Sequence, residues 1–283
     1  MTAIKKFEKA PLQSIAIFGA GGRMGREVAD YLSYAAPDIA LRLIASSQAS
    51  LDTVSKAFPN LDAVVASYFD PASLDAALAG VDGVFVVTPP GLDESIAMTN
   101  LAASLKKGGS VRQVIRLLGY APEFTPAKYP WDKLKTGGEH FIAKEILEQS
   151  GLPMTYVNLG ASLLDNYFFM QPALLRSRTM IWPERSVPLM DVRDLGEVIA
   201  RLFLDSDSRY IGSFLTLNNG YDYVTTAEMA ATMSEAFRVP IAVETSRSAF
   251  LAEYGPTFEQ RFGQPGMAEV LLDYFEWENA NWK

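Results

Sequence analysis

Residues 14–25 read Ser14-Ile15-Ala16-Ile17-Phe18-Gly19-Ala20-Gly21-Gly22-Arg23-Met24-Gly25. The run up to Phe18 is short and apolar and stops at a glycine, as a buried strand does, and a helical apolar spacing begins at Arg23. In such a turn one glycine allows the tight bend, one lets a pyrophosphate approach the backbone, and one lets helix pack closely on strand. The N–H groups at the helix start attract phosphate. We therefore expect a dinucleotide site made by Gly19, Gly21, Gly22, Arg23, Met24 and Gly25.

Strand and helix patterns alternate from this turn to about residue 160. The further predicted strands are Ile39–Ala45, Ala63–Tyr68, Val81–Val87, Val111–Leu118 and Met154–Leu159. The predicted helices are Arg23–Tyr34, Ser73–Leu78, Asp93–Lys107 and Gly138–Gln149. Alternation of this kind predicts an α/β fold with a doubly wound parallel sheet, the Rossmann architecture.

The later half of the chain is less regular. It contains a helical pattern over Asp191–Leu204, a short strand pattern at Phe214–Leu217 and a helix over Ala227–Phe237 that Thr226 would cap. The aromatic, acidic segment Tyr254–Lys283 would form a lid or a packing surface. We expect a nucleotide-binding domain over residues 1–159 and a smaller, mostly helical substrate domain over 160–283. A return of 191–217 to the first domain is left open.

Composition excludes several classes of site. The 283 residues include no cysteine and one histidine, which excludes thiolate catalysis, cysteine-bound metals and multi-histidine metal sites. The formal net charge of −8 argues against nucleic acid as a partner. No apolar run reaches the roughly 18–20 residues of a membrane span. We expect a cytoplasmic protein with a small-molecule substrate, no metal and no membrane contact; a homodimer is left open.

The end of the second predicted strand indicates which dinucleotide binds. An acidic residue there would accept a hydrogen bond from the ribose 2′-hydroxyl of NAD(H). The sequence instead reads Ile44-Ala45-Ser46-Ser47-Gln48, without an acid. Ser46 and Ser47 would donate to a 2′-phosphate and Arg23 would add positive charge, so NADP(H) is favoured and NAD(H) is left open.

Several segments together resemble the NmrA-like family of atypical short-chain dehydrogenases. The resemblance covers roughly residues 12–240 and is specific for the family but not for the substrate. It implies an NADP(H)-dependent reductase of quinones, dyes or iminium compounds, or a regulator that binds NADP without obvious turnover. The segments that carry it are the glycine turn, Phe69–Asp82, His140-Phe141-x-x-Lys144, Glu148–Thr155, Asp165-Asn166 and Asp191–Gly196.

The resemblance also implies residue roles. Asp70 would lie beside the adenine, although an N-cap of the following helix is an equal alternative. Thr88 and Pro89 would line the cofactor cleft, and Lys144 would reach the nicotinamide ribose. The segment 160–166 would flank the nicotinamide.

One departure from the family pattern concerns proton transfer. Ordinary short-chain dehydrogenases use Tyr-x-x-x-Lys with a serine before it, but His140 stands at the tyrosine position, four residues before Lys144. The serine position reads Leu117-Leu118-Gly119-Tyr120. His140 and Lys144 share a helix face. The candidate catalytic residues are therefore His140, Lys144 and, as a second donor, Tyr120, each with packing or solvation as its alternative.

Because the usual tyrosine and serine are missing, the sequence favours an acceptor that needs little protonation, such as an iminium, a cationic dye or a quinone. Asn166, Tyr167, Phe169 and Trp182 would wall an aromatic pocket for it, with core packing as the alternative. We expect an NADPH-dependent reductase of a small aromatic or conjugated acceptor. A dinucleotide-sensing regulator is the second hypothesis, and an epimerase-like enzyme the third, disfavoured by the missing tyrosine.

Overall fold

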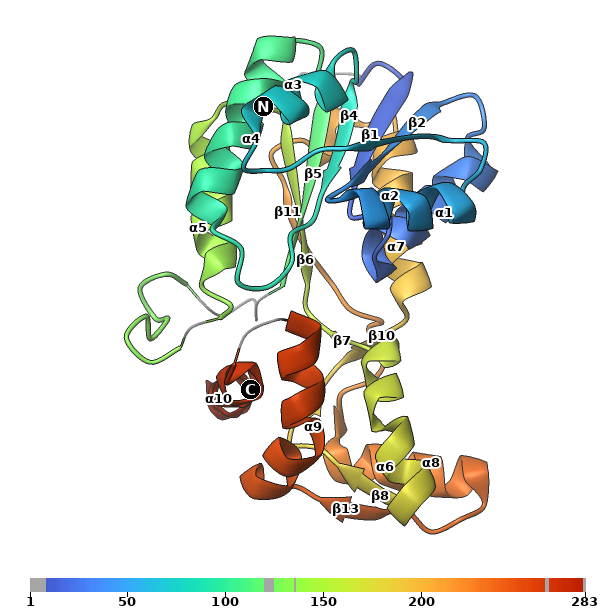
Figure 1. The fold of residues 1–283 in the computed structure, drawn as a ribbon, viewed down its shortest axis with the longest axis vertical. Helices are drawn as coiled ribbons and strands as arrows, with labels where there is room; N and C mark the ends of the chain where they lie inside the picture. The colour runs from blue at the N-terminus through green and yellow to red at the C-terminus, as the bar shows by residue number, and fades with distance from the viewer. Residues whose placement is uncertain (1–8, 120–124, 135, 263–264, 282–283) are drawn as a thin grey trace, which may run out of the picture. The chain divides into compact units, whose positions relative to one another are not determined.

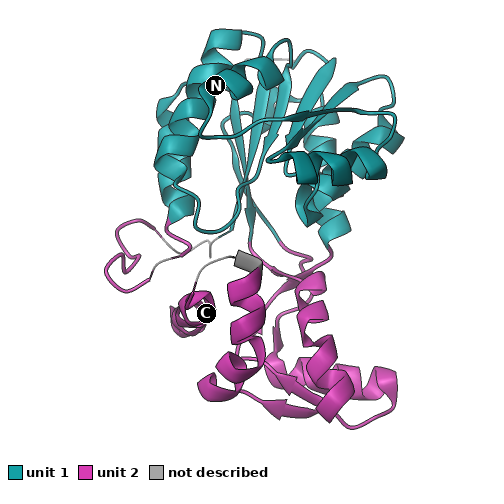
Figure 2. Cartoon of the chain, viewed as in Figure 1, with its two compact units in different colours: residues 1–119, 139–159, 192–217 teal, residues 120–138, 160–191, 218–283 magenta. Residues whose placement is uncertain are grey.

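The computed structural model describes residues 9–119, 125–134, 136–262 and 265–281. The chain divides into two compact units (Figure 2). Unit 1 comprises residues 1–119, 139–159 and 192–217, and unit 2 comprises residues 120–138, 160–191 and 218–283. The division places 192–217 with the glycine turn, and 120–138 with the C-terminal residues.

Unit 1 is built on a seven-stranded parallel sheet in the described residues, with strand order β11-β6-β5-β4-β1-β2-β3 (Figure 1). The chain winds outward from β1 in one direction and then from β4 in the other, so the strand order reverses between β1 and β4. Ligands of open α/β sheets bind at the carboxyl ends of the strands at this reversal. The Rossmann prediction is confirmed, with strands β1 (Ser14–Phe18), β2 (Ala40–Ala45), β3 (Asp62–Val65), β4 (Gly83–Val86), β5 (Gln113–Leu118), β6 (Met154–Leu159) and β11 (Phe214–Leu217).

Burial along the strands explains why their sequences read as apolar runs. Every residue of β4 and β5 is buried, because helices cover both faces of the sheet. The edge strand β3 is half exposed and shorter than the predicted Ala63–Tyr68. Its continuation leaves the sheet, and the Tyr68 ring stacks on Phe18 with ring centroids 4.7 Å apart.

Helices α3, α4 and α5 cover one face of the sheet, and α1 packs on α7 at the other (Figure 1). The α1–α7 contact is close: a Cβ atom built at Gly196 would lie 2.7 Å from the carbonyl carbon of Glu27. Helix α2 was not predicted, because it buries only Val54 and its apolar pattern is weak. The helices of this unit are α1 (Arg23–Ala35), α2 (Gln48–Ala57), α3 (Pro71–Leu78), α4 (Glu94–Gly108), α5 (Glu139–Gln149), α7 (Val192–Leu204) and the 3-10 turn η2 (Ser208–Tyr210).

Unit 2 is mostly helical, as expected, and has its own core of aromatic side chains and methionines. The Trp182 ring is its centre, packed against Phe250 and Tyr254 with ring centroids 5.4 and 5.8 Å away. Within this unit the segment from Tyr254 onward supplies core residues, so it is a packing surface. The elements are β7 (Ser162–Leu163), η1 (Leu164–Met170), α6 (Gln171–Ser177), β8 (Thr179–Ile181), β9 (Ser186–Val187), β10 (Leu189–Met190), β12 (Val224–Thr225), α8 (Thr226–Phe237), β13 (Ala242–Glu244), α9 (Arg247–Phe262) and α10 (Met267–Asn281).

The predicted cap of α8 was wrong by one residue. Thr225, not Thr226, is the N-cap, and its side chain forms a capping box with Glu228. Thr226 is fully buried, and its hydroxyl donates to the Pro183 carbonyl oxygen over 2.8 Å. Two adjacent threonines could serve as cap, and burial decided between them.

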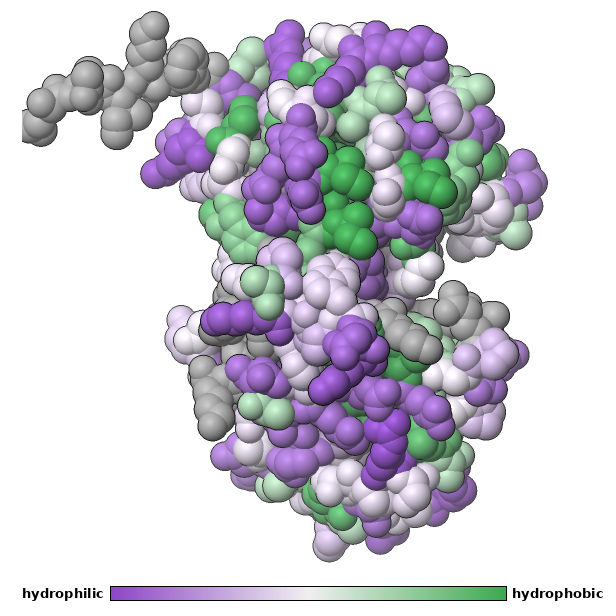
Figure 3. Space-filling model, turned by 90° about the vertical axis from the view of Figure 1, so that its left-hand side faces the viewer, coloured by the Kyte–Doolittle hydropathy of each residue, from purple (hydrophilic) through white to green (hydrophobic). Residues whose placement is uncertain are grey.

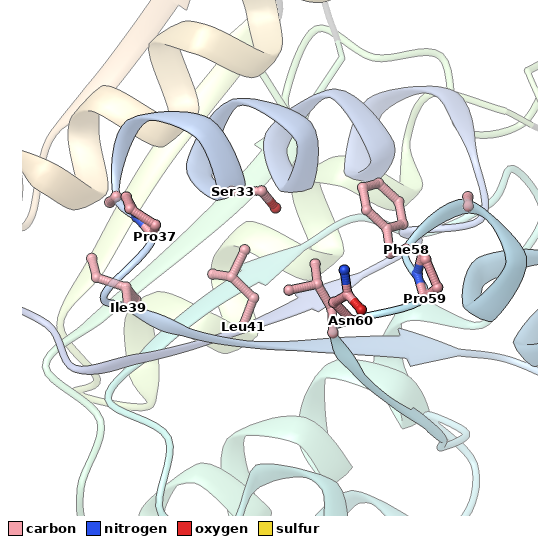
Figure 4. A pocket seen from close by; sticks show the side chains of 10 residues that line it. Ser33, Pro37, Ile39, Leu41, Phe58, Pro59 and Asn60 are labelled. Carbon is pink, nitrogen blue, oxygen red and sulfur yellow. The ribbon is translucent and has the colours of Figure 1, made fainter.

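Hydrophilic side chains spread over the face drawn in Figure 3, with hydrophobic ones in small groups among them. No helix of the described residues is long and apolar enough to cross a membrane. A surface hollow lies at the amino ends of β2 and β3, lined by Ser33, Pro37, Ile39 and Phe58 among others (Figure 4). This edge of the sheet is opposite the glycine turn, so the hollow contains none of the predicted site residues.

Candidate functional site

The glycine turn follows β1 at the carboxyl edge of the sheet, as predicted. Gly19 has a φ angle of +70°, and its carbonyl oxygen accepts a 2.8 Å hydrogen bond from the Gly22 N–H. A Cβ atom at Gly25 would lie 2.5 Å from the Gly19 carbonyl carbon, so helix and turn pack too closely for a side chain. Gly22 differs, because a Cβ atom there would meet only the Gly19 oxygen, at 3.3 Å.

The start of α1 suits an anion. The N-cap of this helix is Gly22, which has no side chain to cap it, and the first turn contains no acidic residue. By contrast, carboxylates of Asp70 and Asp93 cap α3 and α4. The N–H groups at the start of a helix and the positive end of its dipole attract phosphate oxygens. The turn therefore fits a dinucleotide pyrophosphate, with Arg23 and Met24 half-buried beside it.

The end of β2 presents serine hydroxyls where an acid would select NAD(H). Ser46 and Ser47 are both exposed, and the Ser47 hydroxyl caps α2 by accepting from the Ser50 N–H over 3.2 Å. Arg42 is engaged elsewhere, since its side chain donates to Asp62 and to the Ala77 carbonyl oxygen. These groups fit a 2′-phosphate better than a free 2′-hydroxyl.

Asp70 and Thr88 already have protein partners. The Asp70 carboxylate accepts from the N–H groups of Ala72 and Ser73, which is the N-cap alternative named above. The Thr88 hydroxyl lies half-buried just after β4, followed by an exposed Pro89. Adenine contact by Asp70 and cofactor contact by Thr88 and Pro89 stay predictions.

Lys144 and His140 lie on α5 and face different parts of the sheet. Lys144 pairs with Glu148 on its own helix, and its Nζ atom lies 5.4 Å from the centre of the Tyr156 ring on β6. His140 lies instead near the end of β5, where a Cβ atom built at Gly119 would be 3.5 Å from its Nε2 atom.

The protonation of His140 is set by burial. Desolvation, with a smaller contribution from the nearby Arg116 cation, lowers the pKa of His140 to about 3. Its Nδ1 atom is buried and makes no hydrogen bond to any described protein atom. The imidazole is therefore neutral near pH 7 and is a poor source of a proton for transfer.

A buried charged pair behind His140 was not predicted. Arg116 on β5 is 0% exposed and its Nη2 atom lies 2.6 Å from Oε1 of Glu94, which is 2% exposed. Burial raises the pKa of Glu94, and the adjacent Arg116 cation opposes this shift. The run Gln113–Leu118 reads as an ordinary buried strand, and Glu94 lies far from it in sequence, so no local pattern signals the pair.

The predicted substrate residues all lie in unit 2. Trp182 is 4% exposed and its ring belongs to the core, whereas Asn166, Tyr167 and Phe169 are partly exposed on η1. The Tyr167 hydroxyl is buried, and burial raises its pKa. Tyr120 lies outside the described residues. No cluster of potential metal ligands occurs among the residues that the structure describes.

Proteins of known name resemble this chain in sequence and in architecture. A reductase from Streptomyces griseus, named (4-alkanoyl-5-oxo-2,5-dihydrofuran-3-yl)methyl phosphate reductase, is 27% identical over 266 residues, covering 88% of this chain and 85% of the relative. An NADPH-dependent quinone oxidoreductase from Escherichia coli, solved with NADPH, matches with a TM-score of 0.74 at 20% identity, covering 94% of this chain and 89% of the other. Triphenylmethane reductase from Citrobacter sp., solved with NADP(H), matches with a TM-score of 0.73 at 19% identity, covering 94% and 90%. The model of the NmrA-like family matches residues 11–253, and the chain belongs to that family.

Proposed function

We propose that this protein is an NADPH-dependent reductase that transfers hydride to a small aromatic or conjugated acceptor. The observation that carries this proposal is the start of α1: its N-cap is a glycine without a capping side chain, its first turn contains no acidic residue, and a Cβ atom built at Gly22 would meet only the Gly19 oxygen, at 3.3 Å. A dinucleotide pyrophosphate fits this position. The Streptomyces relative is named a reductase, and the structures from Escherichia coli and Citrobacter were solved with NADPH and NADP(H).

Within this proposal unit 1 binds the dinucleotide and unit 2 contacts the acceptor. Ser46, Ser47 and Arg23 select NADPH over NADH, because they offer hydroxyls and positive charge where NAD(H) would need an acid. Lys144 would reach the ribose hydroxyls after exchanging its contact with Glu148. The partly exposed side chains of η1, Tyr167 and Phe169, are better placed to touch an acceptor than Trp182, whose ring already packs in the core.

The acceptor class follows from the proton chemistry. NADPH would supply the hydride when bound, and the described residues of α5 and of the end of β5 provide little acid for the accompanying proton. The His140 imidazole is neutral, and leucine and glycine replace the usual serine. A quinone, an iminium or a conjugated carbonyl delocalises or neutralises the incoming charge, so the proton can come later from water. Simple ketones, which need an acid in the transition state, would be poor substrates.

A panel assay tests the proposal. NADPH oxidation is followed with quinones, imines, cationic dyes and conjugated lactones, each beside a saturated ketone as the matched control. Turnover of the conjugated acceptors and none of the ketones is the expected result. Tight NADPH binding without any turnover would favour a dinucleotide-sensing regulator instead. A homodimer, a cytoplasmic location and the absence of nucleic-acid binding belong to the same proposal, and size-exclusion chromatography reports the first of them.

A further inference from the structure

The most unusual group in unit 1 is the cation buried inside its sheet. Nη2 of Arg116 donates to Oγ1 of Thr88 over 2.7 Å and to Oε1 of Glu94 over 2.6 Å. The Thr88 hydroxyl in turn donates to the same Glu94 oxygen. Two side chains, one from just after β4 and one from the start of α4, thus meet a single guanidinium nitrogen of the β5 residue Arg116.

Those contacts fix the two ends of the loop between β4 and α4. Thr88 follows β4 and Glu94 begins α4, so Arg116 holds both ends of the β4–α4 loop, residues 87–93. The loop starts beside the glycine turn, because a Cβ atom at Gly19 would lie 2.7 Å from Cγ1 of Val87. The Tyr68 hydroxyl further fixes this start by donating to the Val87 carbonyl oxygen over 3.2 Å.

Stability alone does not account for the charged pair. Burying two charges costs free energy that their attraction often fails to recover, and an apolar pair of similar volume usually serves as well. The pair is also incompletely bonded: Nε and Nη1 of Arg116 and Oε2 of Glu94 make no hydrogen bond to any described protein atom. What the charges do provide is a directional link between β5 and the two ends of the loop.

We propose that Arg116 is a positioning residue for dinucleotide binding, which holds the β4–α4 loop, through Thr88 and Glu94, in the shape that receives the cofactor. The inference rests on the proposed function, because it takes the carboxyl edge at the glycine turn as the dinucleotide site. Arg116 acts on the cofactor only through the loop, since its side chain has no solvent exposure.

The test separates affinity from stability. The Kd of NADPH, from fluorescence titration, and the melting temperature are measured for Arg116→Met, Arg116→Lys, and the double variant Arg116→Met with Glu94→Met. The control is Arg185→Met, which breaks the buried Arg185–Glu278 pair of unit 2. The double variant removes both charges together, so it folds even if Arg116→Met alone leaves too costly an unpaired carboxylate.

We expect the double variant to melt near the parent temperature yet bind NADPH about tenfold more weakly or worse, a loss of at least about 1.4 kcal/mol. Arg116→Lys should recover part of the affinity, and Arg185→Met should lower the melting temperature without changing the Kd. A folded double variant with the parent Kd would overturn the inference and leave the proposed function standing. The same conclusion would follow if Arg185→Met weakened NADPH binding as much as the double variant does. A parent protein that binds no NADPH would overturn both.

Discussion

At Gly22 we expect a side chain to disturb the binding of a phosphate more than the folding of the protein. Its backbone angles, φ −98° and ψ 177°, are extended, so any residue can adopt them. It is also the N-cap of α1, a position where aspartate is among the best residues. The one close contact of a side chain here is with the Gly19 carbonyl oxygen, 3.3 Å from a built Cβ atom, so folding demands glycine less strictly at this position than at Gly25.

Gly22→Asp should keep or slightly raise the melting temperature and abolish NADPH binding. The new carboxylate caps α1 and places a negative charge where we expect the pyrophosphate. Thermal unfolding and NADPH titration of the same sample check both halves. Gly25→Ala is the matched contrast, because a Cβ atom there meets the Gly19 carbonyl at 2.5 Å and should destabilise the fold. Retained NADPH affinity in folded Gly22→Asp would show that the phosphates bind elsewhere.

His140 gives a prediction about pH. Because its pKa is lowered to about 3, the imidazole stays in its neutral form near pH 7 and does not titrate there. The single-turnover rate of hydride transfer to a cationic acceptor should therefore show no inflection near the ordinary histidine pKa of about 6.5. His140→Gln should change that rate far less than the roughly 10²–10⁴-fold loss of a general acid. An inflection near pH 6.5 that disappears in His140→Gln would make His140 the proton donor.

At the scale of elements, the α1–α7 contact depends on a glycine that the sequence analysis did not single out. Gly196→Ala places a methyl group 2.7 Å from the Glu27 backbone, so one helix must shift. We expect a loss of about 1–3 kcal/mol in the free energy of unfolding. Gly108→Ala, at the open end of α4, should change it by less than about 0.5 kcal/mol. Equal effects of the two substitutions in urea unfolding would contradict the tight contact.

Sequence patterns predicted the elements best where burial is uniform. Strands β1, β4, β5 and β6 are buried on both faces, so each reads as a continuous apolar run, and the turn after β1 is signalled by its glycines. Helix α2 was not predicted because a single buried residue, Val54, gives no apolar periodicity. The Arg116–Glu94 pair was not predicted for another reason. Its two residues come from different elements, and a pattern along the chain does not indicate contacts between distant elements.

At the scale of the whole molecule, the buried Lys9 should make the free energy of unfolding depend on pH. Its Nζ atom donates to Gln113 Oε1 and to the carbonyl oxygens of Leu202 and Phe203, which joins the segment before β1 to β5 and α7. Burial lowers its pKa to about 8, against the partial opposition of Asp205. The unfolded chain, with a lysine pKa of 10.5, then binds more protons than the folded protein between pH 8 and 10.5.

The free energy of unfolding should therefore rise with pH across that window through Lys9, and this contribution should vanish in Lys9→Met. Urea unfolding of parent and variant at several pH values isolates it, because other titrating groups cancel in the difference. Parallel curves for the two proteins would mean that Lys9 keeps its ordinary pKa in the folded state.

The central claim is hydride transfer from NADPH to a conjugated acceptor, and isotopic labelling tests it most directly. The protein is mixed with NADPH carrying deuterium at the transferable position and with the best iminium or cationic-dye acceptor of the panel, because such acceptors receive the hydride on carbon and keep the label. The product is then analysed by mass spectrometry. The account predicts one deuterium in each product molecule and one NADP⁺ formed per product. If the acceptor stays unreduced and free of deuterium while NADPH stays tightly bound and unchanged, the account is contradicted.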